Sequence, residues 1–182
     1  ASLCRKRFVL EMHSDLIDRV DRLFFRWIYR SKYFLKLVLI SNYLKKRFLG
    51  YGFDRRKISV LPDGVDINLF VDKRTRKYKR IRIGYGGHLF KGRGVGIIEE
   101  LSVLMPDIDF YLWGGTEKLL DYWRKRTKNI KNIYFKGFVK NSILAVELAN
   151  CDILIMPYRE EVAVFGNKGN TVKWMSPMKM FE

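Results

Sequence analysis

The sequence has 182 residues, 48% of them hydrophobic, which suffices for one large domain or for parts of two. Its two cysteines, Cys4 and Cys151, stand far apart, which excludes a disulfide framework and fits a reducing compartment. The net charge of +17 leaves three interpretations open: a solvated basic surface, attraction to anionic lipids, or nucleic-acid binding. Basic residues are spread along the chain and no nucleic-acid-binding signature is present, so we rank nucleic acid last and expect none.

The first half predicts strands that alternate with helices. Phe8–Met12 forms the first predicted strand, and an amphipathic helix follows. Its apolar face comprises Leu16, Ile17, Val20, Leu23, Phe24, Trp27 and Ile28. Phe25 and Tyr29 interrupt its polar face, and we expect them to dock on a missing part of the protein or to lie at a membrane interface. Further strands are predicted at residues 37–40 and 58–61, with a helix between them that Ser41 or Asn42 caps.

The second half repeats this alternation. Strands are predicted at residues 81–85, 108–113, 133–135 and 153–156, the last of them apolar throughout. Helices are predicted from Val95, from a cap at Thr116 and from a cap at Ser142. This order predicts a parallel sheet covered on both faces, with ligands beyond the carboxyl ends of its strands.

Residues 84–94 form a glycine-rich basic loop between a strand and a helix, which is typical of phosphate sites. Two well-known phosphate-binding motifs do not match this loop. Leu89 occupies the place of the third glycine of the dinucleotide fingerprint, and the acid expected after the next strand is missing. Arg93-Gly94 stands where an ATP-binding loop needs Lys-Ser or Lys-Thr. The loop therefore favours a phosphate ligand that is neither a nicotinamide dinucleotide nor ATP.

The segment G-H-L-F-K-G-R-G at residues 87–94 resembles the G-R-L-x-x-x-K-G motif of GT-B glycosyltransferases of the retaining family 4 type. Four more segments resemble that family in the same order, at residues 39–44, 61–70, 149–157 and 176–182. The resemblance implies an α/β fold with two Rossmann-like parallel-sheet domains, both incomplete here. Residues 1–72 would end the N-terminal acceptor-side domain, and residues 73–182 would form most of the C-terminal nucleotide-sugar-binding domain. Because the chain starts at Ala1 and ends without a stop signal, we expect a fragment cut at both ends.

The resemblance also implies a site for the donor diphosphate, made by Gly87, His88, Lys91 and Arg93. His88 stands where the family usually has arginine, and Arg93 stands where it has lysine. Arg93 keeps the positive charge of that lysine, whereas His88 matches an arginine only when it is protonated.

Further roles follow from the same resemblance. Ser176 and Lys179 would lie at the N-terminus of the donor helix, and Glu182 would bind the ribose. The family's second acid is replaced by Trp174. His13, which ends the first strand, would be the catalytic residue in the interdomain cleft.

The implied function is transfer of a sugar from a nucleotide-sugar donor, with retention, to an acceptor such as a lipid-linked or cell-surface glycan precursor. We expect no cofactor and no metal, because no His, Cys and carboxylate set has metal-ligand spacing. The expected location is cytoplasmic, with peripheral contact to anionic membrane. The alternatives are another GT-B-like enzyme, such as a nucleotide-sugar epimerase or a phosphorylase, and a basic module that binds membranes or nucleic acid.

Overall fold

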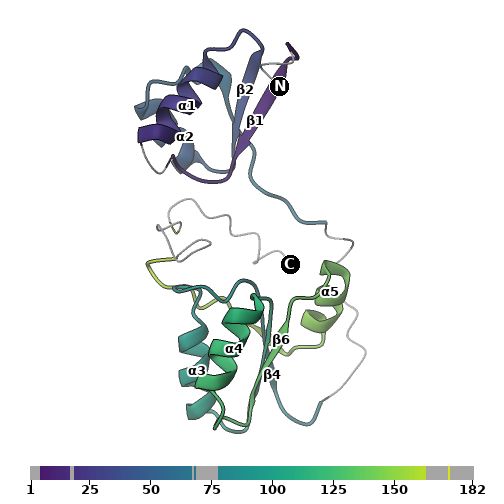
Figure 1. Cartoon of the computed structure of the whole chain (residues 1–182). Coiled ribbons are helices and arrows are strands. Elements are labelled where there is room, and N and C mark those ends of the chain that lie inside the picture. The colour runs from purple at the N-terminus through teal and green to yellow at the C-terminus, as the bar shows by residue number, and fades with distance from the viewer. Residues whose placement is uncertain (1–4, 17–18, 67, 69–77, 163–171, 173–182) are drawn as a thin grey trace. The chain divides into compact units, whose positions relative to one another are not determined.

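The computed structural model describes residues 5–16, 19–66, 68, 78–162 and 172 (Figure 1). The described residues up to Gly64 belong to one compact unit, unit 1, and residues 65–162 belong to a second, unit 2. The predicted domain boundary after residue 72 lies outside the described residues and stays a prediction.

Unit 1 is a three-stranded parallel sheet with helices in its connections. Its strands, in sheet order, are β1 (Phe8–Met12), β2 (Phe34–Leu39) and β3 (Ile58–Val60). Its helices are α1 (Arg19–Tyr29), α2 (Asn42–Gly50) and the short 3₁₀ helix η1 (Arg55–Lys57). Parallel neighbours cannot be joined by a tight turn, so each connection crosses over a face of the sheet. The predicted cap of α2 is confirmed, since the Ser41 hydroxyl accepts a hydrogen bond from the Leu44 N–H at 3.3 Å.

Aromatic side chains hold α1 to the rest of unit 1. The ring of Phe25 lies 5.6 Å from that of Phe48 and 5.5 Å from that of Phe53, both edge-to-face. The ring of Tyr29 lies 5.1 Å from that of Phe34 and 4.6 Å from that of Phe53. The prediction that Phe25 and Tyr29 dock elsewhere is therefore wrong, because their rings fill the core of their own unit.

The apolar stripe predicted for the same helix is mostly exposed instead. Val20, Leu23, Phe24 and Trp27 keep between 57% and 72% of their surface accessible. Helical periodicity located the stripe correctly, but these four side chains face solvent instead of the core.

Unit 2 is a four-stranded parallel sheet in the order β6-β5-β4-β7. Its strands are β4 (Arg82–Gly86), β5 (Asp109–Trp113), β6 (Ile133–Gly137) and β7 (Ile153–Leu154). Its helices are α3 (Val95–Leu104), α4 (Glu117–Arg126) and α5 (Asn141–Ala149). Helices α3 and α4 cover one face of the sheet and α5 lies on the other (Figure 1).

Two details of unit 2 correct the sequence predictions. The apolar run at residues 153–156 contributes only the two-residue strand β7, whose Ile153 and Leu154 are each almost half exposed at the sheet edge. Ser142 is not the cap of α5, which starts at Asn141 with Lys140 as its N-cap residue.

Candidate functional site

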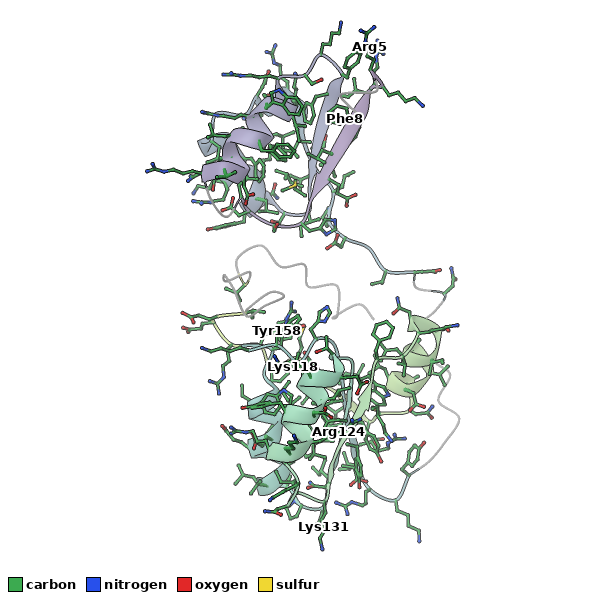
Figure 2. The ribbon with its side chains drawn as sticks, in the orientation of Figure 1. Arg5, Phe8, Lys118, Arg124, Lys131 and Tyr158 are labelled. Atoms are coloured by element: carbon green, nitrogen blue, oxygen red, sulfur yellow. The ribbon has the colours of Figure 1, made fainter. Side chains whose placement is uncertain are left out.

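The strand order of unit 2 creates a switch point beside β4. The chain runs from β4 outward to β5 and β6, then returns to place β7 on the other side of β4. The segments that follow β4 and β7 therefore meet at the carboxyl edge of the sheet, where open parallel sheets bind ligands. Figure 2 shows Tyr158, which follows β7, at this edge, and Lys131, which precedes β6, at the opposite edge.

Arg93 on the glycine loop contacts Tyr158 directly. Its Nη1 donates a hydrogen bond to the Tyr158 hydroxyl at 3.0 Å, and its Cζ lies 5.0 Å from the centre of that ring. The Arg159 N–H donates to the Gly92 carbonyl at 2.9 Å and ties the two segments together. These contacts hold the half-buried guanidinium of Arg93 in place at the sheet edge.

Two glycines of the loop are required for this close approach. Gly92 has φ +83°, and a Cβ there would lie 1.8 Å from the Glu161 carbonyl oxygen. Gly94 has φ +86°, and a Cβ there would lie 2.0 Å from the Pro157 carbonyl oxygen. The glycines expected to admit an anion thus also let the loop pack against the segment after β7.

The start of α3 offers backbone donors at the same edge. Gly94 is its N-cap residue and supplies no side-chain hydrogen bond to the amides of the first turn. The positive end of the helix dipole adds to the charge of Arg93 and of the exposed Lys91. An uncapped helix N-terminus beside two cations is an arrangement that favours an anionic ligand.

The first part of the loop is fixed by the sheet. The Gly87 N–H donates to the Trp113 carbonyl at 2.9 Å, so this amide is engaged within the protein. The buried Tyr85 hydroxyl donates to the His88 carbonyl at 2.7 Å, and burial raises the pKa of Tyr85 far above its usual range. The exposed His88 ring stacks on Phe90 with 5.1 Å between ring centres.

A hollow of about 940 Å³ opens next to the loop. Residues 89–92 and 94 of the loop and the start of α3 line it together with α4 and residues 158–161, whereas Arg93 is not among its lining residues. On its α4 side, the Trp123 indole donates to the Leu89 carbonyl at 3.3 Å. The hollow is large enough for a drug-sized organic ligand.

His13 lies in unit 1, just after β1, between two carboxylates. Its Nε2 is 3.0 Å from Glu11 Oε1, and its Nδ1 is 3.4 Å from Asp63 Oδ1. Among the described residues, these three form the group whose ligand atoms lie close enough together to hold a metal ion. Sequence spacing missed the group because Asp63 follows β3, far along the chain, and only the parallel pairing of β1, β2 and β3 brings the strand ends together.

The remaining predicted site residues lie outside the described ranges. These are Ser176, Lys179 and Glu182, together with Trp174 at the place of the missing acid. Gly87, His88, Lys91 and Arg93 lie in one loop, and the diphosphate-binding, ribose-binding and catalytic roles all stay predictions.

Within the described ranges, the chain has no helix with the length and apolar character needed to cross a bilayer.

No family model matches the sequence. The chain is 23% identical over 183 residues to the processive diacylglycerol alpha-glucosyltransferase of Acholeplasma laidlawii, covering 86% of this chain and 55% of that protein.

Solved structures with low sequence identity share the fold of the chain. HepE of Anabaena in complex with UDP-glucose matches with a TM-score of 0.65 and 16% identity, over 84% of this chain and 47% of HepE. A glycosyltransferase of Rickettsia africae matches with a TM-score of 0.64 and 19% identity, over 85% of this chain and 46% of that one. Sucrose-phosphate synthase of Thermosynechococcus elongatus matches with a TM-score of 0.65 and 13% identity, over 84% of this chain and 44% of that one. The chain thus spans about half the length of these proteins, and the expected GT-B type of α/β fold is confirmed.

Proposed function

We propose that the chain belongs to a glycosyltransferase that moves a sugar from a nucleotide-sugar donor to an acceptor with retention of configuration. The observation that carries the proposal is the glycine-basic loop between β4 and α3. It lies at the switch point of the sheet and combines a held guanidinium, Arg93, with an uncapped helix N-terminus. This combination suits the diphosphate of a nucleotide sugar, which carries negative charge before and after sugar transfer.

In this proposal Arg93 is the main diphosphate ligand. His88 and Lys91, both exposed on the same loop, add hydrogen bonds and charge, and Gly87 lets the backbone approach the ligand. As the bond between sugar and diphosphate breaks, negative charge grows on the leaving diphosphate. Fixed cations and the dipole of α3 stabilise that charge without having to reorganise, which lowers the barrier. No bound metal is needed for this step.

The other proposed contacts come from residues outside the loop. Glu182 accepts hydrogen bonds from the ribose hydroxyls, while Ser176 and Lys179 begin the helix that receives the donor. His13 is the proposed catalytic residue near the donor sugar. Its two ring nitrogens face Glu11 and Asp63, and these carboxylates fix the orientation of the imidazole.

The relatives suggest the classes of donor and acceptor. HepE has been crystallised with UDP and with UDP-glucose, which supports a uridine diphosphate sugar as the donor. The Acholeplasma laidlawii relative is a diacylglycerol glucosyltransferase, which supports a membrane lipid or a lipid-linked glycan precursor as the acceptor. A lipid acceptor requires the enzyme to work at a membrane surface, so we propose peripheral contact with the cytoplasmic membrane face.

Titration calorimetry with UDP tests the proposal. Arg93→Ala removes a charged hydrogen-bond donor worth about 1.5–3 kcal/mol, so the Kd for UDP should rise about tenfold to a hundredfold. Lys131→Ala is the matched control, since it removes the same charge from the opposite edge of the sheet and should change the Kd less than about twofold. Equal affinities of the wild type and Arg93→Ala would remove Arg93 from the site.

A further inference from the structure

Helix α1 has a second apolar face that the described residues of its own unit leave exposed. Phe25 is buried, at 5% exposure, and belongs to the aromatic core of unit 1. On the other side Val20, Leu23, Phe24 and Trp27 are 72%, 67%, 61% and 57% exposed. Their spacing of three and four residues places them in one stripe along the helix.

This stripe is a continuous surface rather than scattered apolar residues. The rings of Phe24 and Trp27 stack on each other with 6.1 Å between centres and 26° between planes. Leu23 and Val20 continue the stripe toward the start of the helix. A contiguous exposed apolar patch of this kind marks a site of interaction with a partner or a membrane.

Arginines flank the stripe. Arg19, Arg22 and Arg26 line a hollow of about 640 Å³ together with Leu23 and the turn at residues 50–53. The Arg26 Nη2 donates to the Tyr51 carbonyl at 3.2 Å, which holds one side of the hollow. Apolar and cationic surface therefore meet along the same helix.

The charges on α1 indicate which kind of partner binds its exposed apolar face. The helix carries three arginines and one aspartate, within a chain whose formal net charge is +17. A second copy of the chain, docked by a two-fold axis on this face, would bring its own arginines against Arg19, Arg22 and Arg26. An anionic bilayer offers phosphates to the arginines and an acyl boundary to the stripe, and tryptophan is favoured at that depth.

We propose that α1 docks unit 1 on an anionic lipid bilayer. The stripe of Val20, Leu23, Phe24 and Trp27 enters the boundary between head groups and acyl chains, and the hollow lined by arginines takes lipid phosphates. The inference rests on the proposed function in one respect: docking at this surface gives the proposed transferase access to a lipid acceptor. Docking itself requires no nucleotide.

Co-sedimentation of the full 182-residue chain with unilamellar vesicles tests the inference. The wild type should bind vesicles of equal parts phosphatidylglycerol and phosphatidylcholine much more strongly than vesicles of phosphatidylcholine alone. Phe24→Ser with Trp27→Ser should weaken binding about tenfold or more, because less apolar area enters the bilayer. The matched control is Val103→Ser with Leu104→Ser, two exposed residues of α3, which should bind like the wild type.

A second pair of variants tests the arginines. Arg19→Gln with Arg22→Gln should weaken binding to the anionic vesicles about tenfold. Lys125→Gln with Lys128→Gln makes the same change of net charge at exposed sites of unit 2, and it should have a smaller effect. The proposal would be overturned if the arginine variant and the lysine variant lost vesicle binding equally. It would also be overturned if Phe24→Ser with Trp27→Ser bound vesicles as strongly as the wild type.

Two further readouts separate the remaining outcomes. A concentration-dependent dimer that Phe24→Ser with Trp27→Ser abolishes, without vesicle binding by the wild type, would assign the face to a second copy and overturn membrane docking. Circular dichroism and the urea-unfolding midpoint of the same samples show whether each variant is folded, and UDP binding is measured beside them. Retained UDP binding without vesicle binding refutes the docking alone, and vesicle binding without UDP binding refutes the proposed function alone.

Discussion

Glycines 94 and 96 are two residues apart, and the structure predicts opposite effects when each is changed to alanine. Gly94 has φ +86°, and a Cβ there would meet the Pro157 carbonyl oxygen at 2.0 Å and its carbon at 2.6 Å. Both atoms are backbone, so they cannot move aside as a flexible side chain would. Gly96 lies in the first turn of α3, and a Cβ there would meet no atom within 4 Å apart from its chain neighbours and the backbone of its own helix.

The magnitudes follow from these geometries. A left-handed conformation costs a residue with a Cβ about 1–2 kcal/mol, and overpacking adds about 1–3 kcal/mol. Gly94→Ala should therefore lower the free energy of unfolding of unit 2 by about 2–5 kcal/mol. Gly96→Ala should raise it by about 0.5–1 kcal/mol, because alanine loses less conformational entropy than glycine on entering a helix.

Urea unfolding followed by tryptophan fluorescence measures both effects. Trp113 is buried in unit 2, so its emission reports the unfolding of that unit, whereas Trp27 is already exposed and contributes little change. We expect the midpoint to fall for Gly94→Ala and to rise slightly for Gly96→Ala. Equal midpoints for the two variants, or a Gly94→Ala variant within about 0.5 kcal/mol of the wild type, would refute the packing described for the loop.

Two other substitutions have defined outcomes. The buried Asn132 amide donates to three backbone carbonyls 2.7–3.0 Å away, so Asn132→Ala should lower the stability of unit 2 by about 1–3 kcal/mol, and an unchanged urea midpoint would contradict this network. In the proposed transferase, His13→Ala should lower the rate of sugar transfer from the nucleotide-sugar donor by about a hundredfold but leave the Kd for UDP within about twofold. Unchanged turnover would remove His13 from the mechanism.

The sequence predicted the order of strands and helices because the residues that begin and end these elements are easy to recognise. Gly, Pro and cap residues separate apolar segments of the right length, and the α/β alternation follows from them. The glycine loop could be located and its phosphate chemistry argued from residue types alone. The cap at Ser41 was also predictable, because a hydroxyl before a helix has few other roles.

Other features could not be predicted because they depend on contacts between distant segments. Arg93 meets Tyr158 only because β7 returns to the side of β4, and His13 meets Asp63 only because three strands end at one edge. The orientation of α1 was mispredicted for a related reason. Periodicity finds an apolar stripe, but the rings of Phe34, Phe48 and Phe53 determine which side of the helix packs inward.

The most direct test of the central claim is a UDP titration followed by the backbone amide signals of the ¹⁵N-labelled chain. If the loop between β4 and α3 holds a diphosphate, the signals of residues 88–96 should shift with a common Kd. Amides at the opposite edge of unit 2, such as that of Lys131, should stay in place. Shifts that are absent from the loop, or that appear only elsewhere, would contradict the assignment of this loop as the donor site.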